Sequence, residues 1–240
     1  PKTSSAASDV YKRQVPAEIE SSGRWLASLP ALPASAEPRS LVLLENGQFI
    51  AARRGILVGD VWLAAGQSNM AFAVKGMVKG LPETQAWVDS ANLPQIRVRR
   101  VSAQVLADRE TEAADLPAPS PWMPMTPENV PQFSAVAASF AREVHEKIQI
   151  PVGIIDVSWG GKPIEPFIPR EAYQIPQLRP ILDLANADKL DELGKIPGGV
   201  IIRNREGHPG AIFNARISPL TSFGLRGFLW YQAESNAGSG

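Results

Sequence analysis

The 240-residue chain contains no cysteine, which excludes disulfide bonds, zinc–thiolate sites and a thiol nucleophile. Its two histidines, His145 and His208, are too few for a multi-histidine metal site. No apolar run approaches the roughly 18 residues that a helix needs to span a bilayer. Lysine plus arginine number 24, as do aspartate plus glutamate, so no excess of charge favours binding to nucleic acid or to an anionic membrane.

Residues 1–20 contain no apolar segment of the kind found in signal peptides. Residues 1–14, PKTSSAASDVYKRQ, are polar and aperiodic, and resemble adapter sequence read through at the end of an environmental gene fragment. We therefore interpret them as a non-native or disordered head. On this interpretation, the true N-terminus and any signal peptide lie outside the sequence.

Residues 15–58 have the pattern of antiparallel β structure. Two short apolar runs, Ser40–Leu44 and Gln48–Ala51, are separated by a segment containing Asn46-Gly47, which is a strong hairpin signal. This stretch is too small to bury a core alone, so we interpret it as the end of a β-rich domain.

The pattern changes in residues 59–240. Near-continuous apolar runs at Val61–Ala64, Pro151–Val157 and Gly227–Tyr231 predict strands that are buried on both faces of a sheet. The alternating run Ile96–Val101 predicts a strand nearer an edge. An amphipathic helix is predicted over Ser134–Ile148, with an apolar face repeating every four residues at Val136, Phe140, Val144 and Ile148. Strands that alternate with helices indicate an α/β domain with a parallel sheet.

Polar loops follow the three apolar strands, and in such a sheet these loops meet at one edge. They are GQSN at 66–69, SWGGK at 158–162 and QAESN at 232–236. Ser68 is either a helix N-cap or a nucleophile at a strand-to-helix turn, with backbone N–H groups nearby to hold an oxyanion. Its surroundings do not match the G-x-S-x-G elbow of α/β-hydrolases.

The other two loops also allow a structural and a functional interpretation. Gly160 and Gly161 form either a tight turn or a backbone that a ligand can approach closely. Gln232, Glu234 and Asn236 either stabilise a loop or line a polar cleft, because buried amides are costly unless they are paired.

Taken together, these blocks resemble the sialate O-acetylesterase family of the SGNH-hydrolase superfamily over about residues 23–238. The resemblance in order and spacing is carried by GDVWLAAGQSNM, PVGIIDVSWGGKPIEPF, HPGAIFNARISPLTSFGLRG and GFLWYQAESN. It implies a three-layer α/β/α domain with a flavodoxin-like parallel sheet, preceded by the remnant of a small β domain. It also implies an acetylated sugar or glycan as substrate and a secreted or periplasmic location. No cofactor, metal, nucleic acid, membrane or protein partner is implied.

The resemblance assigns roles to the loop residues. Ser68 would attack an acetyl ester to give an acyl-enzyme that water hydrolyses. The oxyanion hole would combine the Ser68 N–H, a Gly160 or Gly161 N–H, and an amide from either Gln232 or Asn236. Three further residues would bind substrate or order the loops: Gln67, Asn69 and Glu234.

The chain departs from the family pattern at the catalytic base. The family carries Asp-x-x-His near the C-terminus of the hydrolase domain, and no such motif occurs here. His145 is interpreted as a solvated or half-buried helix residue, whereas His208 lies in a loop that could line the cleft but does not match the catalytic position. We therefore expect a fragment truncated at both ends, with weak or no activity by itself, because loss of the base from a serine triad costs several powers of ten.

Smaller departures affect the substrate. Ala233 stands where the family usually has glycine, Lys162 where a small hydroxyl residue is usual, and Arg216 where methionine is common. The two cations would either pair with a substrate carboxylate or be solvated. Two other classes remain open: an acetylxylan-type polysaccharide esterase, and a carbohydrate-binding domain without catalysis. A purely structural α/β domain is the least favoured, because it leaves three aligned polar loops unexplained.

Overall fold

The computed structural model describes residues 5–8, 14–21, 23, 25–101, 120–195 and 208–237. Its contacts divide the chain into two compact units. The first unit comprises Pro1–Asp60 with Ile148–Pro151, and the second comprises Val61–Lys147 with Val152–Gly240.

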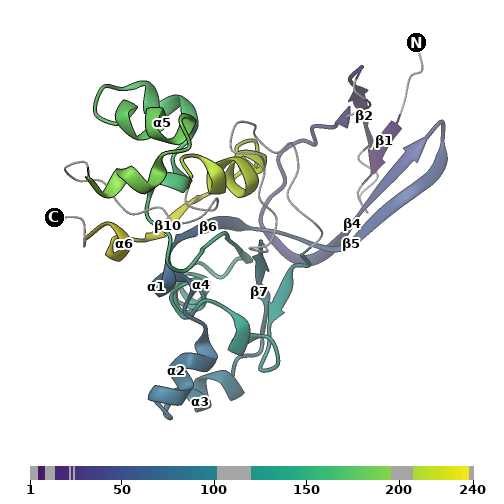
Figure 1. Ribbon diagram of the computed structural model, residues 1–240. Coiled ribbons are helices and arrows are strands. Elements are labelled where there is room, and N and C mark those ends of the chain that lie inside the picture. Colours follow the sequence, from purple (N-terminus) through teal and green to yellow (C-terminus); the bar gives the residue numbers. More distant parts are fainter. Residues whose placement is uncertain are drawn as a thin grey trace. The chain divides into compact units, whose positions relative to one another are not determined.

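Strands build both units (Figure 1). They are β1 (Ser5–Ser8), β2 (Gln14–Ile19), β3 (Trp25–Leu26), β4 (Ser35–Glu45), β5 (Gln48–Val58), β6 (Asp60–Gly66), β7 (Leu93–Arg100), β8 (Met123–Met125), β9 (Val152–Asp156) and β10 (Gly227–Tyr231).

In the part of the chain that the structure describes, the helices all follow β6. The α-helices are α1 (Ser68–Ala71), α2 (Val74–Gly80), α3 (Thr84–Asp89), α4 (Ala135–Ile148), α5 (Arg179–Asn186) and α6 (Glu234–Ala237). The 3₁₀ segments are η1 (Val130–Gln132), η2 (Glu165–Phe167), η3 (Arg170–Gln174), η4 (Leu190–Lys195) and η7 (Ser218–Leu220), and η6 (Phe213–Ile217) is a π-helical turn.

The first unit is an antiparallel sheet with strand order β3-β2-β1-β4-β5. The predicted hairpin is confirmed, because β4 and β5 pair around Asn46 and Gly47. These two residues have φ values of 50° and 78°, the positive values that a type I′ hairpin turn requires. β1 lies within residues 1–14, where the sequence favours a head outside the fold, and it pairs with β2 and β4. The origin of this head and the boundaries 15–58 and 59–240 stay predictions.

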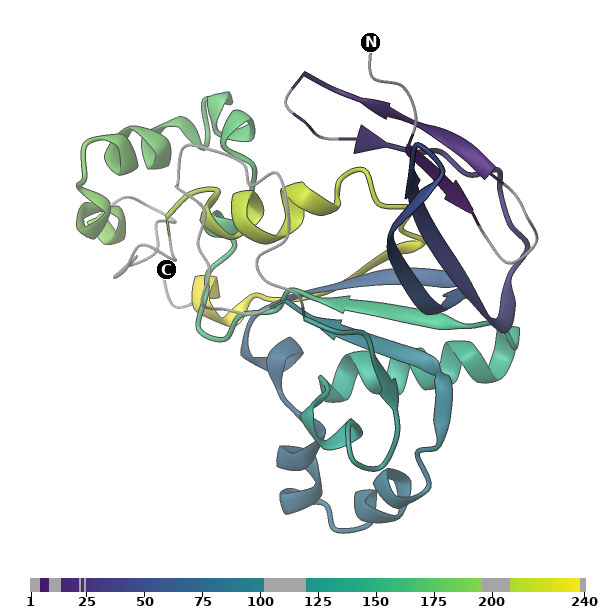
Figure 2. The same ribbon diagram turned by 90° about the vertical axis from the view of Figure 1, so that its right-hand side faces the viewer.

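The second unit contains the predicted parallel sheet, in the order β10-β6-β9-β7-β8. β10 runs parallel to β6 and β7 parallel to β9, whereas the short β8 is antiparallel to β7. Figure 2 shows α4 on one face of this sheet and the segment containing η6 and η7 on the other. Alternate residues of β6 point to the two faces, since Ala64 joins the core under α4 and Leu63 joins the core with Leu220 of η7. The α/β fold class is therefore confirmed.

The burial predicted for β10 is wrong, although its bounds are as expected. β10 is an edge strand of the described sheet, and Phe228, Trp230 and Tyr231 are each about half exposed or more. The central strand β6 and the edge strand β10 both have apolar sequences. The sequence alone therefore does not reveal whether a neighbouring strand or helix covers such a strand.

The helix α4 is confirmed, but its predicted apolar face is only partly correct. Phe140 and Val144 pack against the core, whereas Val136 and Ile148 are exposed. The fully enclosed face consists of alanines and His145 instead, because small side chains let the helix approach the sheet closely. The interpretation of His145 as solvated or half-buried is therefore wrong.

Candidate active site

Three loops meet where β6, β9 and β10 end, as the sequence predicts. Gly66 ends β6 opposite Tyr231, the last residue of β10. The Gln67 N–H donates to the Tyr231 carbonyl at 3.0 Å, and the Trp159 N–H donates to the Gly66 carbonyl at 2.8 Å. Figure 1 shows α1 and α6, which follow two of these strands, at the same end of the sheet.

The turn after β6 requires glycine at position 66. Gly66 has a φ of +139°, and a Cβ placed there would lie 2.0 Å from the Tyr231 carbonyl oxygen. The absence of a side chain therefore lets the chain leave β6 in contact with β10 and turn directly into α1.

Ser68 is the first residue of α1, and its side chain is exposed. The interpretation of Ser68 as an N-cap is wrong, because Gln67 occupies the cap position and no side chain forms a capping hydrogen bond there. Among the described residues, the Ser68 hydroxyl has no hydrogen-bond partner. A Cβ placed on Gly160 would lie 3.7 Å from the Ser68 Cα and 3.8 Å from its Cβ, so the glycine backbone of the second loop lies beside the serine. The Ser68 hydroxyl is therefore accessible to a substrate, and the neighbouring Gly160 backbone is not shielded by a side chain of its own.

Gln67 and Gln232 join the first and third loops. The Gln232 Nε2 donates to Gln67 Oε1 at 3.1 Å, and the Ser235 N–H donates to the same oxygen at 3.0 Å. A second link connects these loops, since Asn69 Nδ2 donates to a carboxylate oxygen of Glu234. Gln67, Asn69, Gln232 and Glu234 were all predicted for the site, and the structure brings them together.

Asn236 joins the third loop to the second. Its Oδ1 accepts hydrogen bonds from Gln232 Nε2 at 2.6 Å and from the Ile164 N–H at 3.0 Å. Its Nδ2 donates to the two carboxylate oxygens of Glu165 at 3.3 and 3.2 Å. The side-chain nitrogens of both Gln232 and Asn236 are therefore already bound to acceptors.

Sequence reasoning missed Glu165, which begins η2 and is almost completely buried. Burial raises the pKa of its carboxyl above the ordinary 4.5, against the opposing effects of a backbone hydrogen bond and the Asn236 amide. Its backbone carbonyl accepts a hydrogen bond from the Tyr173 hydroxyl at 2.6 Å. The sequence did contain a signal, PIEPF, in which this acidic residue lies among prolines and apolar residues.

The raised pKa of Glu165 predicts a pH effect on stability. The folded chain holds the proton more tightly than the unfolded chain, so this group adds stability as the pH falls through its raised pKa, and the gain is complete below the ordinary value of 4.5. Glu165→Gln removes that titration. Urea unfolding at several pH values should therefore show the free energy of unfolding of the wild type rising, relative to the variant, as the solution is acidified. A difference that stays constant or shrinks over this range would contradict the assignment.

Lys162 and Arg216 are both buried, so the interpretation of them as solvated residues is wrong. The Lys162 Nζ lies 5.2 Å from the centroid of the Trp159 ring, and the Arg216 guanidinium carbon lies 4.0 Å from it. Burial lowers the pKa of Arg216 to about 10, although the carboxylate of Asp156 opposes this effect. None of the guanidinium nitrogens has a hydrogen-bond partner among the described residues. The cation is therefore stabilised by stacking on the Trp159 ring and by the negative charge of Asp156.

The described residues provide no base for Ser68. His145 lies in the buried face of α4, and His208 is half-buried in the turn before η6. Neither histidine contacts the Ser68 hydroxyl in the described part of the chain. In the same residues no cluster of histidine and carboxylate side chains could hold a metal ion, and no helix has the length and apolarity needed to cross a membrane.

Comparisons with known proteins agree with the geometry. No family model matches the chain. The sialate O-acetylesterase of Mus musculus is 28% identical over an alignment of 250 residues, gaps included, that covers 95% of this chain and 45% of that protein. The sialate O-acetylesterase of Homo sapiens is 31% identical over an alignment of 201 residues that covers 80% of this chain and 34% of that protein. A carbohydrate acetylesterase from Xanthomonas citri, known from its crystal structure, has a TM-score of 0.75 and 27% identity, over 99% of this chain and 46% of its own.

The fold and the three loops define an α/β domain of the SGNH-hydrolase type. The chain is homologous to part of the sialate O-acetylesterases, and the resemblance noted in its sequence is confirmed. It spans less than half the length of each of these three relatives.

Proposed function

We propose that the protein is a carbohydrate O-acetylesterase in which Ser68 is the nucleophile. The supporting observation is the exposed Ser68 hydroxyl at the carboxyl edge of the sheet, with the Gly160 backbone beside it and the amides of the third loop bonded to Gln67. Its homologues include ester hydrolases that share 28–31% of its residues over the matched regions.

The proposed reaction proceeds through an acyl-enzyme. The Ser68 oxygen attacks the acetyl carbonyl carbon, the carbonyl oxygen takes the negative charge, and the sugar oxygen leaves with a proton. The N–H groups of Ser68 and of Gly160 or Gly161 would hold the oxyanion, and water would then release acetate. A base must take the serine proton, and we expect an Asp-x-x-His segment outside these 240 residues to provide it.

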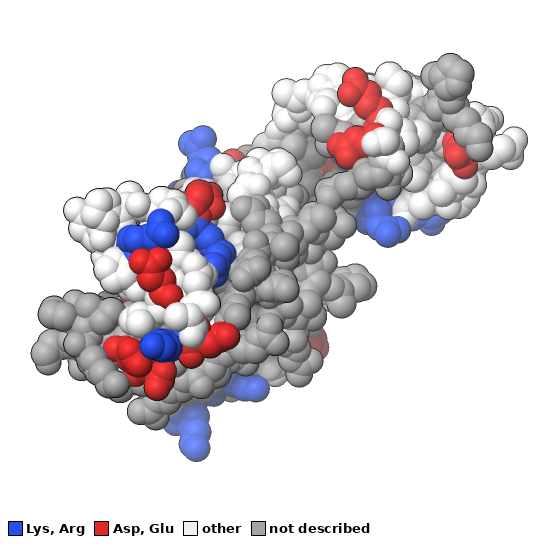
Figure 3. Space-filling model, turned by 45° about the horizontal axis from the view of Figure 1, so that its top comes forward, with Lys and Arg blue, Asp and Glu red and all other residues white. Residues whose placement is uncertain are grey.

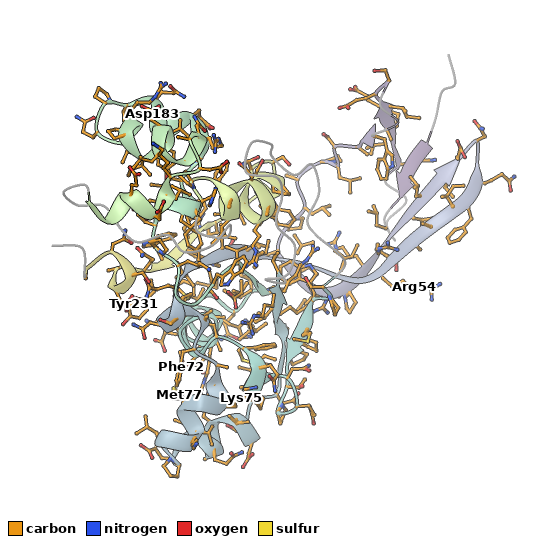
Figure 4. The ribbon with its side chains drawn as sticks, viewed as in Figure 1. Arg54, Phe72, Lys75, Met77, Asp183 and Tyr231 are labelled. Atoms are coloured by element: carbon orange, nitrogen blue, oxygen red, sulfur yellow. The ribbon has the colours of Figure 1, made fainter. Side chains whose placement is uncertain are left out.

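The proposed substrate class is supported by the homologues and by two exposed aromatic side chains at the ends of α1 and β10. Phe72, just after α1, and Tyr231, at the end of β10, are both about half exposed and are labelled in Figure 4. Such rings provide apolar area for the face of a sugar. Figure 3 shows acidic and basic side chains interspersed over the described part of the face in view. An acetylated sialic acid or related acetylated sugar is the substrate we propose. We also propose a periplasmic or secreted location, because acetylated glycans are mostly met outside the cytoplasm.

The test is acetate release by the full-length gene product. Purified protein is incubated with O-acetylated sialic acid, acetylated xylan and an N-acetylated sugar as the control. Acetate released from the O-acetyl esters and not from the amide supports the proposal, and the ratio between the two esters separates a sialate esterase from a xylan esterase. If neither ester is hydrolysed while the acetylated sugar still binds, the protein is a carbohydrate-binding domain and the proposal is wrong.

A further inference from the structure

Two departures from the family pattern meet at one aromatic ring. Lys162 stands where a small hydroxyl residue is usual and Arg216 where methionine is common, and both cations lie over the ring of Trp159. Arg216 is the more unusual of the two, because it is completely buried. It belongs to η6, a π-helical turn, and such turns are frequent at functional sites.

The charge of Arg216 is enclosed without hydrogen bonds. Its Nε and both terminal nitrogens are buried and have no hydrogen-bond partner among the described residues. Taking a cation out of water is costly unless other groups compensate its charge. The compensating groups are the Trp159 ring, whose centroid lies 4.0 Å from the guanidinium carbon, and the carboxylate of Asp156, which acts through its charge. Because the nitrogens are enclosed, we expect Arg216 to affect a reaction through its neighbours and not by contact with substrate.

Asp156 is the last residue of β9 and is also almost completely buried. Its Oδ1 accepts hydrogen bonds from the Ser158 N–H at 2.9 Å and from the Ser158 hydroxyl at 2.5 Å. Burial raises the pKa of its carboxyl, and the hydrogen bonds from Ser158 and the charges of Arg100 and Arg216 oppose this effect. The buried carboxylate and the buried guanidinium therefore contact two consecutive residues of the second loop, Ser158 and Trp159.

Trp159 connects this pair of charges to the proposed nucleophile. Its N–H donates to the Gly66 carbonyl at 2.8 Å, and the next residue, Gly160, lies beside Ser68. A shift of Trp159 would therefore be transmitted through one peptide unit to the Gly160 backbone. An error of about 1 Å in the placement of a group at a reacting centre can lower the rate about 10²-fold.

We propose that Arg216 is a positioning residue, whose buried guanidinium fixes Trp159 and with it the Gly160 backbone. Asp156 is the counter-charge of this cation. Removal of one charge leaves the other buried and uncompensated, so the remaining group moves toward water and displaces the loop. Removal of both charges leaves no such force. The inference depends on the proposed esterase activity, because its consequence is the placement of backbone beside Ser68.

The experiment measures kcat and KM for acetate release by the full-length gene product and its variants. Arg216→Met removes the charge but keeps a long unbranched side chain, and should lower kcat about 10- to 100-fold with little change in KM. Arg216→Lys keeps a cation for the ring and should have a kcat several times higher than that of Arg216→Met. Arg54→Met, at an exposed arginine of β5 in the first unit (Figure 4), is the matched control and should leave both constants unchanged.

The double variant Asp156→Asn/Arg216→Met tests whether the two charges act as a pair. Asp156→Asn alone keeps an oxygen that accepts from Ser158 but leaves the guanidinium uncompensated, and should lower kcat at least about 10-fold. The double variant should have a higher kcat than either single variant, because neither charge is left alone. Factors that multiply in the double variant, or a wild-type kcat in Arg216→Met, overturn the proposal. An inactive wild type, or activity that survives Ser68→Ala, overturns the proposed function instead.

Crystal structures of the wild type and the variants separate positioning from a general loss of stability. In Arg216→Met the Gly160 backbone should move by about 1 Å relative to Ser68, and in the double variant it should return. Asp156→Asn, which has almost the same shape as the wild-type side chain, gives the same comparison if Arg216→Met does not fold. An unmoved Gly160 backbone in a folded single variant with a lowered kcat overturns the inference.

Discussion

Replacement of Ser68 by alanine in the full-length protein is expected to lower kcat for acetate release by about 10⁴- to 10⁶-fold. The effect is this large because the side chain would form the covalent bond to the acetyl group, and the oxyanion donors alone retain only a small part of the rate enhancement. KM should change little, since the serine hydroxyl contributes to the reaction more than to sugar binding. Steady-state assays with an O-acetylated sugar measure both constants.

Ser139→Ala is the matched control for this variant. Ser139 is an exposed residue of α4, and the same change of side chain there should leave kcat and KM as they are in the wild type. If Ser68→Ala retains more than about a tenth of the wild-type kcat, Ser68 is not the nucleophile, because loss of a true nucleophile costs several powers of ten.

Gly66→Ala is expected to destabilise the fold by at least about 3 kcal/mol. The added Cβ would lie 2.0 Å from the Tyr231 carbonyl oxygen, which is backbone and cannot rotate away, and alanine rarely adopts the φ of +139°. Relief of the contact would separate the end of β6 from β10 and break the Gln67–Tyr231 hydrogen bond. Urea unfolding followed by circular dichroism measures the loss.

Gly80→Ala is the control for the glycine variant. Gly80 is the last residue of α2, and an added Cβ meets no atom within 4 Å. Its free energy of unfolding should change by less than about 1 kcal/mol, because alanine favours the helix more than glycine does. Equal stabilities of the Gly66 and Gly80 variants would show that the contact between β6 and β10 is not needed for folding.

Much of the second unit could be predicted from sequence because its signals are local. Apolar runs located β6 and β9, a period of four residues located α4, and polar residues after three strands located the loops at 66–69, 158–162 and 232–236. The convergence of these loops follows from parallel pairing, since the carboxyl ends of parallel strands lie at the same edge. The family resemblance supplied the roles of the residues, which their pattern alone left open.

The features that sequence reasoning missed all depend on neighbours distant in the chain. β10 has the composition of a central strand, and its exposure depends on which element lies beyond it. The direction of the Gln67 amide depends on Ser235, 168 positions away. Arginine is usually a surface residue, and only the position of Trp159 shows that the Arg216 guanidinium is stacked inside the fold.

The most direct test of the central claim is to trap the acyl-enzyme. The full-length protein is mixed with an O-acetylated sugar, the reaction is quenched in acid within milliseconds, and the digested protein is analysed by mass spectrometry. The account predicts one added acetyl group on the peptide containing Ser68, which disappears as the substrate is exhausted and never forms in Ser68→Ala. Rapid acetate release with no acetyl group on that peptide, or with the acetyl group on another residue, would contradict it.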